Sequence, residues 1–195
     1  DANLLDVTME DLHDMPQQLY EGKITKLREK TQGQLVIKEY PTASAHSGHF
    51  KSLMNELALK KSFRPDVIFI DYLNICASSR FKGGNISSYF YVKAIAEELR
   101  GLAVEFNVPI FSATQTTRTG YVSTDIGLED TSESFGLPAT ADFMFALISN
   151  EELEALGQMK VKQLKNRYND PSINRAFIIG VDRAKMRLFD VQQKA

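Results

Sequence analysis

A carboxylate placed directly after a short apolar run is the first group in this chain that could do chemistry. Residues 67–70 are Val, Ile, Phe and Ile, and Asp71 follows them. Such a run predicts a buried strand of a parallel sheet, so Asp71 would lie at the carboxyl edge, where open α/β folds bind ligands. A carboxylate there could hold Mg²⁺ through water in a nucleotide-hydrolysing site, the Walker B position. By itself, the pattern fits equally well an aspartate that only caps the next turn.

An amide follows the next predicted strand along the chain. Gln115 lies just past the apolar segment 108–113, which places its amide beside Asp71 if the two strands are neighbours. An amide can hydrogen-bond a terminal phosphate or a water without bringing charge, as a sensor of nucleotide state requires. Taken alone, a loop glutamine in solvent is the simpler interpretation.

Two cations, Lys165 and Arg167, stand near the end of a later predicted strand. Alternation along a strand places them on the same face, with Asn166 opposite. Together they suit the developing charge of a transferred phosphoryl group, and the turn that follows predicts that Arg167 ends its strand and projects from the domain. Two solvated cations on an edge strand are the alternative.

Two loops carry groups that could grip the phosphates of single-stranded nucleic acid. One leaves the Asp71 strand and contains Arg80 and Lys82. The candidates in the second loop, residues 116–136, are Arg118, Thr119, Asp130, Glu133 and Ser134. Its acidic residues argue against strong electrostatic binding, so several copies in a ring would be needed.

The elements that must position these groups alternate between strands and helices. Strands are expected at residues 34–40, 67–71, 108–113 and 143–148. Helices are expected to start at residue 8 and to cover residues 20–30, 47–62 and 87–107. This order predicts an α/β fold with a mainly parallel sheet and flanking helices. Three more strands are expected at 158–167, 176–181 and 186–191, and the last two form a C-terminal antiparallel hairpin.

The composition limits the domain count, the possible partners and the compartment of the protein. The chain has 195 residues, the size of one ordinary domain. Its net charge of −2 gives no global basic surface, so contact with nucleic acid requires a local patch or a channel shared between subunits. No run approaches the roughly 18 apolar residues of a membrane span. The single cysteine, Cys76, excludes an intrachain disulfide, suits a reducing compartment and is expected to be buried.

In combination, these motifs resemble the ring-forming replicative DNA helicases of the DnaB type, and among them the primase-associated helicases of T4-like bacteriophages. The resembling stretches are residues 71–73, 98–103, 107–109, 112–115, 130–134, 141–142 and 165–167. The resemblance covers nearly the whole chain from about Asp66 onward.

The resemblance implies a RecA-like P-loop NTPase core that uses ATP and Mg²⁺ in the cytoplasm of a bacterial host. It also implies a homo-hexamer that moves on single-stranded DNA, with a primase and a helicase loader as partners and no membrane. Asp71 would organise Mg²⁺ and water, and Gln115 would couple nucleotide state to the two DNA loops. Lys165 and Arg167 would reach the nucleotide bound by the adjacent subunit.

Departures from the family pattern limit this interpretation. The chain contains no Gly-x-x-x-x-Gly-Lys-[Ser/Thr] stretch, the loop that cradles phosphates. In the family, that loop, the general-base glutamate and the N-terminal collar all precede the equivalent of Asp1. We therefore expect residues 1–195 to be a partial motor domain that is inactive alone and binds ATP and Mg²⁺ only within a full-length parent.

Loss of the P-loop strand has a consequence for folding. The strand would lie between those at 108–113 and 143–148, so its absence leaves a gap that must be refilled or rearranged. Two other functions stay open: a RecA-type recombinase or clock-type ATPase that does not unwind DNA, and a non-catalytic interaction module.

Overall fold

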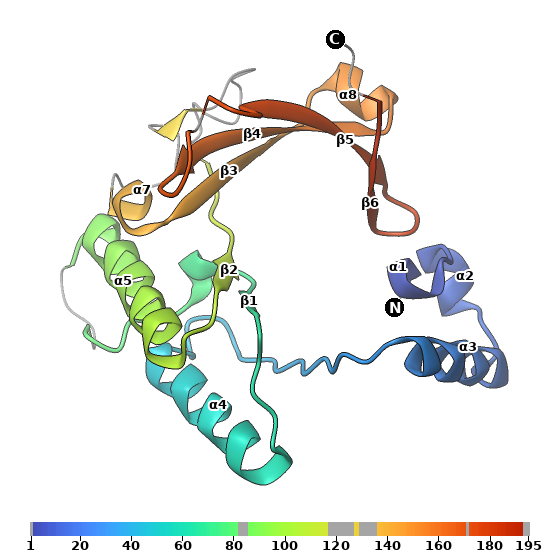
Figure 1. Ribbon diagram of the computed structural model, residues 1–195, viewed down its shortest axis with the longest axis horizontal. Coiled ribbons are helices and arrows are strands. Elements are labelled where there is room, and N and C mark those ends of the chain that lie inside the picture. Colours follow the sequence, from blue (N-terminus) through green and yellow to red (C-terminus); the bar gives the residue numbers. More distant parts are fainter. Residues whose placement is uncertain (1, 82–85, 117–126, 129–135, 171, 193–195) are drawn as a thin grey trace. The chain divides into compact units, whose positions relative to one another are not determined.

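The strands of the computed structural model form two separate sheets (Figure 1). The structure describes residues 2–81, 86–116, 127–128, 136–170 and 172–192. One sheet pairs β1 (Ile68–Ile70) in parallel with β2 (Ile110–Ser112). The other has the order β3 (Phe143–Ile148), β4 (Gln158–Asn166), β5 (Ala176–Asp182), β6 (Arg187–Asp190). Among the described residues no pairing joins β2 to β3, which is the interruption predicted from the sequence.

The helices divide between two units of the chain. They are α1 (Ala2–Leu5), α2 (Met9–His13), α3 (Gln17–Lys30), α4 (Ser47–Lys61), α5 (Ser88–Phe106), α7 (Gly136–Thr140) and α8 (Glu151–Ala155), with a 3-10 turn η1 (Leu73–Ile75). Unit 1 comprises residues 1–38, 145–163 and 172–195, and unit 2 comprises residues 39–144 and 164–171. The last residues of β4 therefore belong to unit 2.

The core of unit 2 is built around α5, where the sequence placed its strongest helix. One face of this helix is buried, with Ile95 only 1% exposed. The core residues are Met54, Leu73, Cys76, Val92, Ile95, Ala96, Leu99, Leu102 and Leu137. Each large side chain buried in this way contributes about 1.5–3 kcal/mol to folding. Cys76 is buried as expected, and its burial raises the pKa of the thiol.

Unit 1 ties the N-terminal helices to the C-terminal hairpin. The hydroxyl of Thr8 accepts from the Asp11 amide at 3.0 Å, which confirms the predicted helix start. The amide of Met9 donates to the carbonyl of Ala184 at 2.8 Å, in the turn between β5 and β6. The β5–β6 pair is antiparallel, as predicted.

The predicted strand at residues 34–40 is wrong. The segment is not a strand in the structure, and Leu35 and Ile37 are each 77% exposed. It contains the boundary at residues 38 and 39, where the chain passes from unit 1 to unit 2. A short apolar run forms a strand only where a neighbour completes its hydrogen-bond ladder, and none of the described strands pairs with this one.

None of the described helices is both long and apolar enough to span a bilayer.

Candidate functional site

Asp71 leaves the carboxyl end of β1, as the sequence predicted. Ile70 is the last paired residue of β1 and lies opposite Ser112 of β2, whose hydroxyl donates to the Ile70 carbonyl at 2.8 Å. The Asp71 side chain is exposed, and its peptide bond to Tyr72 is cis. The carboxylate is thus presented at the edge of the sheet, where α/β folds take their ligands.

Asp71 could hold Mg²⁺ together with other ligands. Within the described residues, no group of three or more His, Cys, Asp or Glu side chains is placed to hold a metal ion by itself. Mg²⁺ in nucleotide sites needs no such cage, because it keeps several waters and takes one or two carboxylates together with phosphate oxygens. A single exposed Asp71 at the sheet edge provides that kind of donor.

Gln115 reaches the same edge because β1 and β2 are neighbours. The hydroxyl of Thr114 donates to the side-chain carbonyl of Asn74 at 2.8 Å, which ties together the two segments that follow the strands. Nε2 of Gln115 donates to the Tyr72 hydroxyl at 3.3 Å. The expected pairing of the two strands is confirmed, and the amide contacts the residue immediately after Asp71.

Lys165 and Arg167 lie on one side of the end of β4, as predicted, and both meet the last residues of α7. The Lys165 ammonium donates to the carbonyl of Pro138. Nη2 of Arg167 donates to the carbonyl of Ala139 at 3.0 Å. Carbonyls at a helix C-terminus lack helical partners, so cations there are stabilised.

Asp142 joins these cations to α5. Its Oδ1 accepts from Nη1 of Arg100 at 2.8 Å and forms an ion pair with Nη1 of Arg167, also at 2.8 Å. Arg100 donates also to the carbonyl of Thr140 at 2.8 Å, and the amide of Arg167 donates to the Asp142 carbonyl at 3.0 Å. We call Arg100, Asp142, Lys165 and Arg167 the Asp142 cluster. β4 ends at Asn166, one residue before the predicted end, and the exposed guanidinium of Arg167 is bound within its own unit.

The Asp142 cluster carries an excess of positive charge. Its three cations and one carboxylate leave a formal charge of +2. The hydrogen bond from Arg100 lowers the pKa of Asp142 below its usual value, against the effect of burial, and the charges of Arg100, Arg167 and Lys165 lower it further. Burial, and then repulsion by Arg167, lower the pKa of Lys165. Such a cluster attracts anions.

A second carboxylate, Glu98 of α5, is surrounded by neutral donors. It accepts from the hydroxyls of Ser78 at 2.6 Å and Ser47 at 2.7 Å, and from the hydroxyl and amide of Ser79 at 2.7 and 2.9 Å. We call these four residues the Glu98 network. Burial of the carboxylate raises its pKa, but the donated hydrogen bonds outweigh burial and lower the pKa to about 2.

Arg80, a predicted DNA-binding residue, directly follows the Glu98 network. Its guanidinium forms an ion pair with Glu97 at 2.5 Å and is half exposed. The other predicted DNA-binding residues lie outside the described residues and stay predictions: Lys82, Arg118, Thr119, Asp130, Glu133 and Ser134.

The sequence assigned no role in the site to Arg100, Asp142 or Glu98. Asp142 could have been noticed in the sequence, because it directly precedes the apolar strand β3, just as Asp71 directly follows the apolar strand β1. Glu98 lies in the stretch 98–103 that carries the family resemblance, but its partners Ser47 and Ser78 lie 51 and 20 residues away along the chain and could not be recognised locally.

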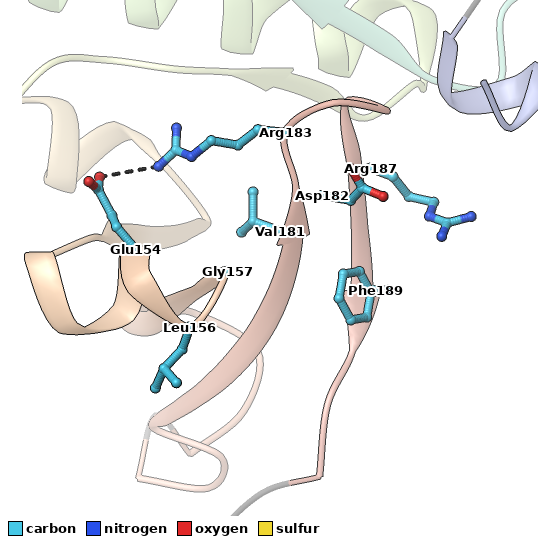
Figure 2. Close-up of a pocket in the computed structure, with 8 residues that line it drawn as sticks. All are labelled: Glu154, Leu156, Gly157, Val181, Asp182, Arg183, Arg187 and Phe189. Carbon is cyan, nitrogen blue, oxygen red and sulfur yellow. Dashed lines mark hydrogen bonds and ion pairs between the residues drawn. The ribbon is translucent and has the colours of Figure 1, made fainter. Parts of the chain in front are cut away.

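An open pocket of about 520 Å³ lies in unit 1, between α8 and the β5–β6 hairpin (Figure 2). Glu154 and Arg183 form an ion pair there at 3.2 Å. Its lining residues are Glu154, Leu156, Gly157, Val181, Asp182, Arg183, Arg187 and Phe189. None of these described residues is among the predicted site residues.

Comparison with known proteins gives one relative in sequence and several in structure. No family model matches the chain. Over 99% of its length it is 46% identical to a DnaB-like replicative helicase of Enterobacteria phage T4, and it covers 41% of that protein. The chain therefore spans about two fifths of the relative's length.

Two solved structures show the fold. One is an ATPase domain, which matches 98% of the chain at 15% identity with a TM-score of 0.78, and 68% of that domain is covered. The other is a DnaB-like replicative helicase, described together with its interactions with primase. It matches 98% of the chain at 16% identity with a TM-score of 0.77, and 46% of it is covered. The predicted RecA-like α/β fold is confirmed.

Proposed function

Because the chain belongs to the DnaB-like replicative helicase family, we propose that it is part of a motor that couples ATP hydrolysis to the unwinding of duplex DNA at the replication fork. The observation that carries this proposal is the shared sheet edge. Asp71 and Gln115 follow two neighbouring parallel strands, and their segments are linked through Asn74 and Tyr72. That is the arrangement needed for a metal-holding acid beside a sensor of the terminal phosphate.

The residues at this edge have different tasks. ATP with Mg²⁺, when bound, supplies the phosphoryl group that is transferred to water. Asp71 would hold the metal through water, and its negative charge would orient the water molecules around it. Gln115 hydrogen-bonds the terminal phosphate or the water and passes a change there to the following segment, where the DNA-binding loop begins.

Lys165 and Arg167 act on the nucleotide of the adjacent subunit. Their positive charges stabilise the charge that develops on the phosphoryl oxygens during transfer. The excess positive charge of the Asp142 cluster supports this role, since it provides cations in one place. Each active site is then shared between two copies of the chain, as a ring of copies allows; we propose a homo-hexamer.

The DNA lies in the centre of that ring. Arg80 and Lys82 from one loop, and Arg118, Thr119, Asp130, Glu133 and Ser134 from the other, hold the backbone of a single strand. The net charge of −2 supports a shared channel, because one copy alone has no large basic surface. A primase and a helicase loader are the proposed protein partners, and the bacterial host cytoplasm is the proposed location.

The remaining parts of the motor are supplied by polypeptide beyond these residues. The chain spans 41% of its T4 relative and contains no phosphate-cradling Gly-x-x-x-x-Gly-Lys-[Ser/Thr] stretch. Residues 1–195 are therefore a partial motor domain, and we expect no ATP hydrolysis by the purified 195-residue chain. Stoichiometric release of phosphate by that chain would contradict this part of the proposal.

The role of Asp71 is tested in the complete protein that contains this chain. Asp71→Asn keeps the shape of the side chain and removes its charge, so ATP turnover is expected to fall at least about 100-fold. Asp66→Asn is the matched control, since Asp66 is an exposed aspartate at the other end of the same strand. Turnover by Asp71→Asn within threefold of wild type would overturn the assignment.

The shared site is tested by mixing two inactive proteins. Asp71→Asn keeps Arg167, and Arg167→Gln keeps Asp71, so a mixed ring contains interfaces with both residues intact. ATP turnover of the mixture is expected to exceed that of either variant alone by about 10-fold or more. No gain on mixing would place Arg167 outside the neighbour's site.

Turnover without unwinding of a forked duplex would favour a RecA-type ATPase that does not unwind.

A further inference from the structure

Arg167 is held by its own subunit at both its backbone and its side chain. Its amide donates to the Asp142 carbonyl at 3.0 Å, and its Nη1 meets the Asp142 carboxylate at 2.8 Å. Its Nη2 meets the Ala139 carbonyl at 3.0 Å. The guanidinium therefore has a defined position before any neighbour arrives.

Arg100 fixes the carboxylate that holds Arg167. It binds the same oxygen, Oδ1 of Asp142, at 2.8 Å, and it also binds the carbonyl of Thr140 at 2.8 Å. Arg100 extends from α5, directly after the buried Leu99, so its backbone is set by the core of unit 2. Asp142 is thus a bridge between a fixed arginine and the arginine at the end of β4.

The contact between Asp142 and Arg167 is exchangeable. The two side chains are 33% and 39% exposed, and ion pairs exposed to this degree contribute little to stability. A phosphate offers a guanidinium the same kind of anionic oxygens as a carboxylate. The excess positive charge of the cluster favours the arrival of such an anion.

We propose that Asp142 is a positioning residue for Arg167: it holds the guanidinium against Arg100 until a phosphate of the neighbour's nucleotide takes the place of the carboxylate. This inference rests on the proposed role of Arg167 at the adjacent site. Arg100 stays on Asp142 when Arg167 leaves, so the carboxylate is not left without a partner and Arg167 can return.

The test uses the complete protein and separates turnover from binding. Asp142→Asn is expected to lower kcat for ATP by about 10-fold while KM changes less than twofold, because the subunit's own Asp71 edge is untouched. Asp142→Glu, which keeps the charge, is expected to restore part of kcat. Glu105→Gln is the matched control. Glu105 is the exposed acid of another ion pair on α5, with Lys51, and its loss should leave kcat unchanged.

A double variant shows whether Asp142 acts through Arg167. If it does, Asp142→Asn costs less than twofold in kcat when added to Arg167→Gln, since the group that it positions is already gone. A further 10-fold loss in that background would overturn the inference, because Asp142 would then act by another route.

The outcomes separate this inference from the proposed function. If Arg167→Gln abolishes turnover but Asp142→Asn leaves kcat within twofold of wild type, the positioning role falls and the proposed function stands. If Arg167→Gln itself has no effect, both the inference and the proposed function fall.

Should Asp142→Asn fail to fold, Arg100→Gln replaces it. We expect a loss in kcat of about threefold that disappears in the Arg167→Gln background. An unchanged kcat would overturn the inference.

Discussion

Glu98 and Asp142 are both carboxylates of unit 2 with lowered pKa values, yet their partners differ in kind. Glu98 accepts from neutral hydroxyl and amide groups of Ser47, Ser78 and Ser79. Asp142 accepts a hydrogen bond from the guanidinium of Arg100 and forms an ion pair with that of Arg167. The first carboxylate binds neutral donors, whereas the second is outnumbered by cations.

This difference separates two kinds of contact. The Glu98 network holds parts of the unit together, and we call it the joint, whereas the Asp142–Arg167 pair can exchange its carboxylate for a phosphate. The donors of Glu98 come from the start of α4 and from the segment after η1, so one side chain joins three parts of the unit. Displacing Glu98 would break its hydrogen bonds to all three serines. The arginines of the Asp142 cluster, by contrast, can bind a phosphate as readily as a carboxylate.

The largest expected effect is the loss of folding stability when Glu98, at the joint, is replaced. Glu98→Ala leaves hydroxyl and amide donors without their acceptor, so the free energy of unfolding should fall by about 2–3 kcal/mol. The measurement is urea unfolding of the chain followed by circular dichroism. Glu105→Ala, which breaks the exposed pair with Lys51, should cost only about 0.5 kcal/mol. If the two variants lowered the free energy of unfolding equally, the Glu98 network would be no more important for stability than an exposed ion pair.

A smaller effect follows from the pKa of Glu98. Because its folded-state pKa of about 2 lies below the ordinary value of 4.5, its contribution is complete above about pH 4.5 and is lost as the pH falls toward 2. We expect this group to account for about 1–2 kcal/mol of the loss, after allowing for screening by solvent. Unfolding curves of wild type and Glu98→Gln between about pH 5 and pH 2.5 should converge; parallel curves would contradict the assignment.

The smallest effect is expected at the Asp142 cluster, in the absence of nucleotide. Asp142→Asn should lower the free energy of unfolding by about 0.5–1 kcal/mol at low salt and by less at about 1 M NaCl, since salt screens half-exposed charges. The cost of Glu98→Ala should hardly change with salt, because its hydrogen bonds are partly buried. A salt-independent cost at Asp142 would mean that its role is structural, like that of Glu98.

Local patterns in the sequence predicted much of the fold. The apolar stripe of residues 87–107 predicted α5, and the apolar run at 143–148 predicted β3 with the bounds that the structure has. Both predictions succeed because buried residues recur with the period of the helix or strand that contains them. Residues 34–40 show the limit, since the same kind of pattern forms no strand when no neighbour pairs with it.

The candidate site was predictable where it depends on strand ends. Asp71 and Gln115 meet because carboxyl ends of parallel neighbours share an edge, a rule that needs only strand order. The position of Arg167 was not predictable in this way. The turn after β4 indicated a projecting side chain, but Asp142 and Ala139 bind it, and neither contact has a local sign in the sequence.

The sequence by itself determined the α/β elements, the placement of Asp71 and Gln115 at strand ends, and the family to which the chain belongs. Tertiary structure alone decided which charges meet: Arg100 with Asp142 across 42 residues, and Ser47 with Glu98 across 51. Periodic burial is encoded over a few neighbouring residues, so it can be recognised locally. A hydrogen bond or an ion pair between distant side chains exists only once the packed helices bring those two side chains together.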